Sequence, residues 1–530
     1  MALLLRSARV LARAPLRTTL RRTYASQGEE EASFDTVITG FRRASDEQVK
    51  NGNPKFTLTN EVFNTDVVLK TLELADAKAG SVETFFNTNV NTGEGVSRII
   101  AVGIADAKPF PDAEEKHVKI HNARMAAALG MKKARAQGAK IVALENSLGS
   151  AQAIVEGAEL GLYEYTTTKT KSADWKEPPK YGVFPPTEDG LKCMRNGKVQ
   201  ATAQNIARRL METPANMMTP KMFVEEAQAL VGEMGMVTLN AYGRDWLAKE
   251  NMGAVLAVGR GSVEEPQFLV AEYRGPKKVE STKPDFALVG KGVTFDAGGI
   301  SIKPSAGMAM MRGDMGGAAV TLAAFYAIAA LELPLHVTLT IPLVENLPSG
   351  NSVKPGDVVR TRSGMTVEVD NTDAEGRLIL ADAITYTLDT FAPKRLVDVA
   401  TLTGATVVAL GDVYTAMYTP SDKMANGLRV AGMEATDPVW RMPLHDAYLK
   451  AMKKSATADL INVGSREGGA NSAAMFLYEF VRKHEVKDVD WCHLDIAGVM
   501  DSKAAEGYNN KGMTGRPTRM LIAWANGLAN

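Results

Sequence analysis

Residues 371–378, with the sequence NTDAEGRL, constrain the fold most, because they place acidic side chains between a strand pattern and a helix pattern. Residues 367–370 alternate apolar and acidic side chains, which is typical of a strand, and residues 380–386 have the spacing of an amphipathic helix. Proteins with α/β folds place their sites at such strand-to-helix turns. We therefore expect an α/β fold with a site at Asp373 and Glu375.

The spacing of this segment indicates a cation. Asp373, Glu375 and Arg377 lie two residues apart, and in an extended or irregular segment such side chains point the same way. Two carboxylates in one pocket resist ionising together unless a cation neutralises them. A metal site is therefore the favoured reading, although a D-x-E triplet alone is more typical of a solvated acidic turn.

A second polar cluster, in residues 289–319, strengthens the metal prediction. The short apolar run 286–289 is typical of a buried strand and delivers Lys291 and then Asp296. Asp314 is followed by seventeen uncharged residues, which predict a buried helix. Oxygen ligands from these two aspartates and the two acids of 371–378 suit Mg²⁺, Mn²⁺ or Zn²⁺. Four carboxylates exceed the usual need of one catalytic ion, so we expect two divalent ions.

The N-terminus has the composition of a targeting segment. Residues 1–28 contain six arginines and no acidic residue, and four of the arginines share one helical face. This pattern predicts a mitochondrial transit peptide over residues 1–24, with the mature chain starting near Ala25. Arginines interrupt each apolar run, which argues against a secretory signal, and a disordered basic tail is the other alternative. The predicted location is the mitochondrial matrix, with the cytoplasm as the alternative.

Charge and cysteine content narrow the partners. The chain has 61 basic and 61 acidic residues, and subtracting the six arginines of the leader leaves 55 against 61. A mildly acidic protein is a poor general binder of nucleic acid, so we expect none. Two cysteines give no disulfide framework and suit a reducing compartment. No uncharged run reaches the roughly 20 residues of a membrane span, so we expect no membrane.

The pattern of strands and helices predicts two α/β domains. The smaller N-terminal domain shows strand-like runs on either side of a helical stretch, which suggests a parallel sheet. The larger C-terminal domain carries all the motifs and is expected to have a central mixed sheet flanked by helices. Residues 166–187 are rich in Thr, Lys and Pro and predict a linker or exposed excursion. The predicted boundaries are 25–195 for the N-terminal domain, 196–220 for a linker helix and 221–530 for the catalytic domain.

The motifs together resemble the leucine (cytosol) aminopeptidase family of dizinc metallo-exopeptidases. The resemblance covers the chain from about Gln204 to the C-terminus and does not extend before about residue 195. The matching segments are residues 290–304, 311–319, 371–378, 400–405, 493–498 and 512–517.

The resemblance implies a ligand set for two ions. One ion would be held by Asp296, Asp373 and Glu375, and the other by Lys291, Asp296, Asp314 and Glu375, with a water bridging the ions as nucleophile. An ammonium has no lone pair, so Lys291 would have to lose its proton to serve as a ligand.

The resemblance also implies roles for two cations of the chain. Lys303 would stabilise the oxyanion as water attacks the peptide carbonyl, which is the role of a preorganised donor. Arg377 would hold a bicarbonate ion that serves as general base, because an arginine cannot be that base at neutral pH.

The implied reaction is hydrolysis of the N-terminal bond of short peptides. By resemblance, Met311, Thr401, Gly404 and residues 473–476 would line the pocket for the first side chain and favour leucine-like residues. The resemblance further implies a homohexamer of two trimers. The alternatives are a DNA-binding regulator, an inactive assembly protein and a two-metal phosphatase, and the intact site residues favour the peptidase.

Overall fold

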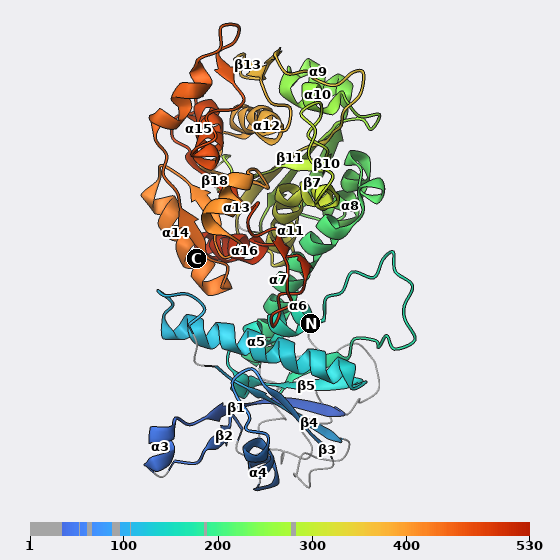
Figure 1. The fold of residues 1–530 in the computed structure, drawn as a ribbon, viewed down its shortest axis with the longest axis vertical. Coiled ribbons are helices and arrows are strands. Elements are labelled where there is room, and N and C mark those ends of the chain that lie inside the picture. The colour runs from blue at the N-terminus through green and yellow to red at the C-terminus, as the bar shows by residue number, and fades with distance from the viewer. Residues whose placement is uncertain are drawn as a thin grey trace. The chain divides into compact units, whose positions relative to one another are not determined.

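The computed structural model describes residues 34–51, 53–60, 66–86, 96–105, 108–184, 188–276 and 282–530. The predicted transit peptide lies outside these residues. The chain forms two compact units, the first made of Met1–Thr202 with Ala504–Asn510 and the second of Ala203–Lys503 with Lys511–Asn530. The border between Thr202 and Ala203 lies inside helix α7 (Glu188–Glu212), so a single helix contributes residues to both units (Figure 1).

In the described part of the first unit, six strands form one sheet, in the order β3-β4-β1-β5-β6, with β2 paired to β1. Strand β1 is parallel to β4 and β5, and β5 is parallel to β6. Strand β2 is antiparallel to β1, and β3 is antiparallel to β4. The strands are β1 (Thr36–Arg43), β2 (Phe56–Leu58), β3 (Val82–Phe86), β4 (Arg98–Gly103), β5 (Ile141–Glu145) and β6 (Lys180–Phe184). The helices are α3 (Asp46–Lys50), α4 (Asp66–Leu74), α5 (Glu115–Ala136), η3 (Asn146–Leu148) and α6 (Ala151–Leu162).

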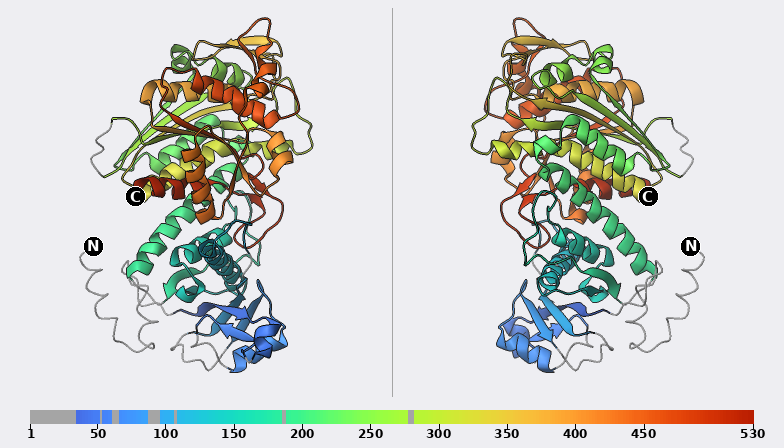
Figure 2. Two further views of the ribbon diagram at one scale, coloured as in Figure 1. Left: turned by 90° about the vertical axis from the view of Figure 1, so that its left-hand side faces the viewer. Right: turned by 90° about the vertical axis from the view of Figure 1, so that its right-hand side faces the viewer.

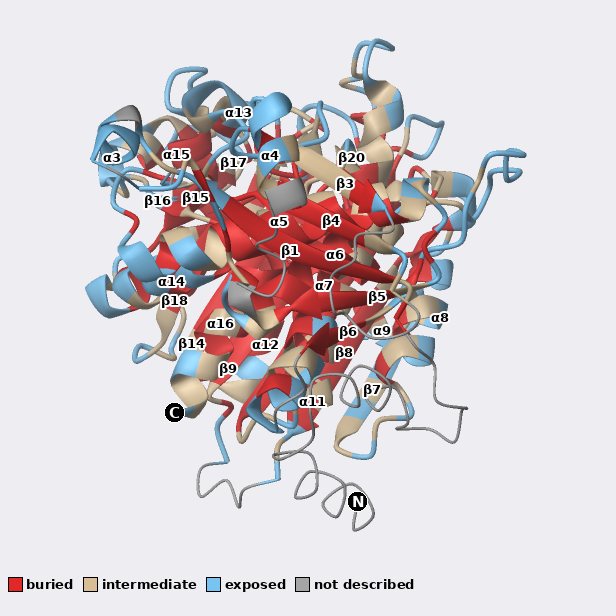
Figure 3. Ribbon diagram, turned by 90° about the horizontal axis from the view of Figure 1, so that it is seen from below, coloured by how far each residue is buried: buried red, intermediate tan, exposed pale blue. Residues whose placement is uncertain are grey.

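Continuous apolar runs in the central strands bury both faces of this sheet. Ile38 and Ile100 belong to one buried cluster with α5 and α6 residues, whereas their neighbours Val37 and Ile99 belong to a second cluster that includes α4 residues. Successive side chains of a strand point to opposite faces, so each strand supplies both cores. Figure 3 shows β1, β4 and β5 as buried strands.

Residues 166–187 differ partly from the expectation of a linker. Residues 167–174 are exposed, as predicted, but β6 within this stretch pairs in parallel with β5 and is part of the sheet. The polar composition of the stretch hid a strand that forms the sheet edge, where one side of the backbone remains unpaired.

The described residues of the second unit form a nine-stranded mixed sheet, which confirms the predicted central sheet. Its order is β16-β15-β18-β14-β9-β11-β8-β7, with β10 paired to β11. These strands are β7 (Val237–Tyr242), β8 (Gln267–Arg274), β9 (Phe286–Gly290), β10 (Gly292–Asp296), β11 (His336–Asn346), β14 (Arg395–Ala400), β15 (Thr415–Tyr418), β16 (Val439–Arg441) and β18 (Asp490–Asp495). The remaining strands are β12 (Asp357–Arg360), β13 (Thr366–Val369) and β17 (Leu460–Ile461) in one small sheet, and β19 (Asp501–Ser502) and β20 (Gly512–Met513) in another.

Helices cover both faces of the nine-stranded sheet (Figures 1 and 2). One layer contains α11 and α16, which pack against each other, and the opposite layer contains α10, α12 and α15, in which α12 packs on the other two. The helices are η4 (Ala215–Met217), α8 (Pro220–Val231), α9 (Arg244–Lys249), α10 (Gly253–Gly259), η5 (Met308–Gly313), α11 (Gly316–Ala330), α12 (Gly376–Phe391), α13 (Gly404–Leu410), α14 (Asp422–Ala435), η6 (Asp446–Lys453), α15 (Gly469–Arg482) and α16 (Thr518–Ala529).

The uncharged run after Asp314 forms the buried helix α11, as predicted. Within the described residues, Met308–Ala330 is the one segment long and apolar enough to cross a membrane, and 89% of its most apolar window is buried in the protein. A helix that is apolar all round and packed on all sides is typical of the core of a large domain.

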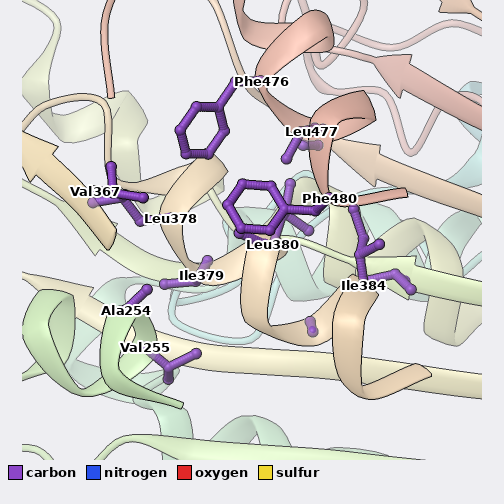
Figure 4. Close-up of a cluster of buried hydrophobic side chains, with 14 of the residues drawn as sticks. Ala254, Val255, Val367, Leu378, Ile379, Leu380, Ile384, Phe476, Leu477 and Phe480 are labelled. Carbon is purple, nitrogen blue, oxygen red and sulfur yellow. The ribbon is translucent and has the colours of Figure 1, made fainter. Parts of the chain in front are cut away.

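Helix α12 is anchored by apolar packing near its first turns. Leu378, Ile379 and Leu380 lie in a buried cluster with Phe476 and Phe480 of α15 (Figure 4). Burial of each such side chain contributes about 1.5–3 kcal/mol. The packing fixes the start of α12 and therefore the acidic residues just before it.

Candidate active site

The carboxyl ends of neighbouring parallel strands deliver most of the site. Lys291 follows β9, Asp296 ends β10, Asn346 ends β11 and Thr401 follows β14. Strand β11 pairs in parallel with β9 and, further along, with β10, and β9 pairs in parallel with β14, so the carboxyl ends of these strands point toward one edge of the sheet. Ligand sites of open α/β sheets lie at this edge.

Three of the predicted ligands form a buried acidic cluster. One oxygen from each of Asp296, Asp314 and Glu375 lies within 4.8 Å of the other two, a spacing that could hold a metal ion. The Lys291 Nζ atom lies 2.7 Å from Asp314 Oδ2 and 2.9 Å from Glu375 Oε1. The structure thus brings Lys291 into direct contact with two of the carboxylates.

Lys303 and Asp373 form the more open side of the cluster. The Lys303 Nζ atom lies 2.7 Å from Asp296 Oδ2 and 2.5 Å from Asp373 Oδ1. The side chains of Lys303 and Asp373 are 21% and 32% exposed, compared with 3% for Lys291. A substrate can therefore reach the cluster from the side of Lys303.

The electrostatics of the cluster favour additional positive charge. Burial raises the pKa of the Asp314, Glu375 and Asp373 carboxyls, and the nearby Asp296 raises each of them further. Burial lowers the pKa of Lys291, but Asp314, Glu375 and Asp296 more than offset this, and the pKa is raised overall. Two ammonium groups facing four carboxylates leave negative charge that divalent cations can neutralise.

A neutral amide and a glycine hold Asp296 in place. The Asn346 Nδ2 atom donates to Asp296 Oδ1 at 2.8 Å, and the Gly298 N–H donates to the same oxygen at 2.8 Å. Gly298 has a φ of +88°, and a Cβ there would lie 2.8 Å from Asp373 Oδ1. A glycine is required because the backbone approaches the acidic side chains closely in a left-handed conformation.

Thr401, which we predict to line the substrate pocket, contacts the acidic cluster. Its hydroxyl donates to Asp314 Oδ1 at 2.8 Å, and its carbonyl accepts a hydrogen bond from Lys291 Nζ at 2.9 Å. Thr401 therefore orients two predicted ligands, a contact that the sequence did not indicate.

The other predicted pocket residues lie on three elements. Gly404 begins α13, where Thr403 caps the helix by accepting from the Thr406 N–H at 3.1 Å, and Gly404 itself is exposed. Helix α13 packs on α15, which contains the buried residues 473–476. Met311 lies in η5 and is half-buried.

The segment 371–378 forms the predicted turn between strand and helix, but helix α12 begins at Gly376, earlier than the helical pattern from residue 380 indicated. Glu375 has helical backbone angles and precedes the first residue of α12. The early start of the helix depends on Gly376, because a Cβ there would lie 2.6 Å from Lys291 Cε. The acidic residues converge through this turn and the start of the helix.

Arg377 lies buried in the first turn of α12. Its Nη1 atom donates to the carbonyl of Asn462 at 2.8 Å, while its Nε–H has no hydrogen-bond partner among the described residues. Burial lowers the pKa of Arg377 to about 10, against the opposing effect of Glu375 and Asp495. A buried guanidinium with an unused donor is suited to binding an anion.

Sequence reasoning missed the neutral residues that support the ligands. Asn346 and Asn462 each hold part of the site, and Thr372 donates to the carbonyl of Gly298 at 2.6 Å. The one usable signal was position, since Asn346 ends a central strand beside the strand of Asp296.

Comparison with known proteins identifies the family of this chain. Residues 205–522 match the catalytic domain of the cytosol aminopeptidase family, and residues 51–172 match the N-terminal domain of that family. The second match corrects our view that the resemblance does not extend before about residue 195.

Individual relatives cover most of the chain. The chain is 41% identical to a cytosol aminopeptidase of Dictyostelium discoideum, covering 89% of this chain and 91% of the relative. It is 43% identical to that of Bos taurus, with 88% of each chain covered. The solved structure of the bottromycin maturation enzyme BotP in complex with Mn is similar with a TM-score of 0.76 and 30% identity, covering 94% of this chain and all of that one.

The matched domains, the curated relatives and the fold agree with the resemblance seen in the motifs and confirm it. The two matched regions also account for both units of the structure. The chain belongs to the cytosol aminopeptidase family, whose members are peptide-hydrolysing enzymes.

Proposed function

We propose that this protein is a metal-dependent aminopeptidase that removes N-terminal residues from short peptides, with a preference for leucine-like residues. The observation that carries the proposal is the buried cluster of Asp296, Asp314 and Glu375 beside Lys291, at the carboxyl edge of the sheet. With Asp373, which contacts Lys303 beside this cluster, the site has four carboxylates. Four exceed the usual need of one catalytic ion and support a site for two divalent cations, Zn²⁺, Mn²⁺ or Mg²⁺.

The residues present fit two ions. Asp296, Asp373 and Glu375 would hold one, and Lys291, Asp296, Asp314 and Glu375 the other. The ammonium groups of Lys291 and Lys303 lie 2.5–2.9 Å from these carboxylates, so the carboxylate oxygens already face positively charged groups, as they would face metal ions. Lys291 would give up its proton to become a ligand.

When bound, two divalent ions supply Lewis-acid polarisation of the peptide carbonyl and lower the pKa of the water that attacks it. Lys303 contributes a donor aimed at developing negative charge. It is held at the open side by Asp296 and Asp373, so its ammonium is positioned before a substrate arrives. Such a preorganised donor lowers the barrier because it needs no reorganisation during reaction.

Arg377 is proposed to hold a bicarbonate ion that takes the proton from the attacking water. The support is the unused Nε–H of a buried guanidinium next to Glu375. Arginine itself stays protonated at neutral pH and cannot accept the proton.

The pocket for the first side chain is proposed to lie between η5 and the starts of α13 and α15, near Met311, Gly404 and residues 473–476. Thr401 would line the same pocket, and its hydroxyl also orients Asp314. Methionine and alanine walls accept leucine-like side chains without rejecting others strongly.

We also propose that the protein works as a homohexamer in the mitochondrial matrix, after removal of residues 1–24. The support for this location is the arginine-rich, acid-free N-terminus, and the support for the assembly is the family resemblance. Neither membrane nor nucleic acid is proposed as a partner.

The test is hydrolysis of leucine p-nitroanilide by the chain starting at Ala25, after chelation and after return of Mn²⁺ or Zn²⁺. Release should require metal and should be lost in an Asp373→Ala, Glu375→Ala double variant. The matched control is Glu225→Ala, Glu233→Ala, which removes two exposed acids of the same unit. Activity that survives chelation or the site variant would refute the proposal, and a preference for other first residues would refute the leucine specificity.

A further inference from the structure

We propose that Asn462 is a positioning residue that fixes both the metal-binding loop and Arg377. The inference rests on the proposed function for the role of the metal, and it adds a residue that would touch neither the ions nor the substrate. Its basis is a set of hydrogen bonds that converge on this one buried residue.

Asn462 is tied to the strand that leads into the loop. It follows β17, which pairs in parallel with β13, and its N–H donates to the Glu368 carbonyl at 3.0 Å. The backbone of Asn462 therefore continues the small sheet beyond Ile461, beside the point where the chain leaves β13 for α12.

The side chain of Asn462 satisfies four main-chain groups of the loop between β13 and α12. Its Oδ1 atom accepts from the Asp370 N–H at 3.0 Å and the Asn371 N–H at 3.2 Å. Its Nδ2 atom donates to the Asn371 carbonyl at 2.6 Å and the Ala374 carbonyl at 3.3 Å. The loop has no regular structure of its own, so these bonds replace the backbone pairing that a strand or helix would provide.

Only an amide of this size meets these demands. Two of the four groups are donors and two are acceptors, so the side chain must both accept and donate. An aspartate has the same shape but would place a charged oxygen against two carbonyl oxygens. Asn462 is fully buried, and a missing partner there would leave polar groups unpaired at a cost of about 1–3 kcal/mol each.

The main chain of Asn462 serves the second part of the site. Its carbonyl accepts the hydrogen bond from Arg377 Nη1 at 2.8 Å. One residue thus holds the loop that carries Asp373 and Glu375 on one side and the guanidinium on the other. A shift of Asn462 would move the metal ligands and the anion site together.

The experiment measures Mn²⁺ affinity by competition with a chromophoric chelator, in the chain from Ala25. We compare Asn462→Ala, Asn462→Asp and the control Thr387→Ala. Thr387 is a buried residue further along α12 whose hydroxyl donates to the Ala383 carbonyl at 2.7 Å and lies 3.1 Å from the Thr340 hydroxyl, away from the ligands. The control therefore loses buried hydrogen bonds on the same helix without touching the loop.

We expect Asn462→Ala to weaken Mn²⁺ binding 10- to 100-fold, as is typical for residues that orient ligands. Asn462→Asp should be at least as damaging, while Thr387→Ala should lower the melting temperature and leave affinity unchanged. Hydrogen exchange at the amides of Asp370 and Asn371 should be faster in both Asn462 variants without metal, because their acceptor is lost or displaced.

The outcomes separate this inference from the proposed function. If the unaltered protein binds Mn²⁺ and Asn462→Ala binds it equally well, the role of Asn462 is overturned alone. Wild-type affinity in Asn462→Asp, or an equal loss in Thr387→Ala, would also overturn it, because packing or general stability would then explain the effect. If the unaltered protein does not bind Mn²⁺, the proposed function fails, and the role of Asn462 toward the metal fails with it.

Discussion

The ammonium of Lys303 lies 2.5 Å from the carboxylate of Asp373, at the most exposed point of the acidic cluster. Lys291, by contrast, pairs with Asp314 and Glu375 where almost no surface is exposed. The two lysines thus divide the cluster into a closed side and an open side. This division suits a ligand role for Lys291 and a substrate-facing role for Lys303.

Replacing Lys303 should impair catalysis more than binding. In Lys303→Ala we expect kcat to fall about 10²- to 10³-fold, the typical effect of removing one oxyanion donor, with a smaller change in KM. Metal content should stay close to that of the unaltered protein. The control is Lys354→Ala, which removes an exposed lysine paired with Asp357. An unchanged kcat in Lys303→Ala would contradict the proposed role.

Removing one acidic ligand should abolish stabilisation by metal. A metal ion that binds only the folded protein stabilises the folded state, so Mn²⁺ should raise the melting temperature of the unaltered protein. In Glu375→Gln we expect this shift to be lost, as measured by calorimetry with and without Mn²⁺. An equal shift in both proteins would show that Mn²⁺ binds elsewhere.

Without metal, the acidic cluster should make stability fall as pH rises. Burial raises the pKa of Asp314 and Glu375, so the folded state binds more protons than the unfolded state above about pH 4. The free energy of unfolding of the chelated protein should therefore decrease from about pH 4 upward. Glu375→Gln should show a shallower decrease, and an identical pH dependence in the two proteins would contradict this account.

Glu479 should stabilise the second unit in the opposite pH range. Its buried carboxylate lies 2.8 Å from Lys453, 2.9 Å from Lys483 and 2.5 Å from Arg482. Burial raises its pKa, but these hydrogen bonds outweigh burial and lower the pKa to about 2. The stabilisation is complete above the unfolded pKa of about 4.5 and is lost as pH falls toward 2.

We therefore expect Glu479→Gln to lower stability at pH 7 by about 1–3 kcal/mol, because three partly exposed cations lose a buried partner. The difference from the unaltered protein should shrink as pH falls from about 4.5 to 2. Thermal unfolding at several pH values measures this, with the exposed Glu485→Gln as control. A difference that does not change with pH would rule out the charge of Glu479 as the cause.

Gly298 should tolerate no side chain, whereas Gly307 should tolerate one at modest cost. Both have a positive φ, +88° and +83°, so alanine is strained at either position by about 1 kcal/mol. At Gly298 the new Cβ would also lie 2.5 Å from the Ser301 carbonyl oxygen, whereas at Gly307 nothing lies within 4 Å. Gly298→Ala should lose metal affinity and activity, and Gly307→Ala should keep both; similar effects would argue against the close approach.

Much of the fold and of the charged site was predictable from local sequence. The uncharged run after Asp314 predicts α11, and the carboxylates at the ends of strands predict an acidic cluster. Each predicted metal ligand lies within a few residues of the end of a strand or the start of a helix. Local pattern is therefore enough to indicate both the layers and the charged groups.

The neutral supports were not predictable, because their partners are distant in sequence. Asn462 contacts Arg377 from 85 residues away, and Thr401 contacts Asp314 from 87 residues away. Neither residue type carries a charge or a periodic pattern that marks such a contact. The helical start of α12 was also missed, since it depends on the fit of Gly376 against Lys291.

Residues 504–510 belong to the first unit, although the chain before and after them belongs to the second. Tyr508 lies in an apolar cluster with Ala128 and Leu160, and the Asn510 side chain donates to the Tyr163 carbonyl at 2.8 Å. The last piece of the N-terminal unit is thus encoded near the C-terminus.

A ribosome translates from the N-terminus, and domains usually fold in that order as they emerge. Here residues up to Thr202 emerge from the ribosome some three hundred residues before Ala504–Asn510, the segment that completes the first unit. Until then, the apolar surface around Leu160 that Tyr508 covers would stay uncovered. The nascent chain would therefore carry an unfinished N-terminal domain through most of its synthesis, a state that chaperones can recognise and that a fragment ending at α7 would never leave.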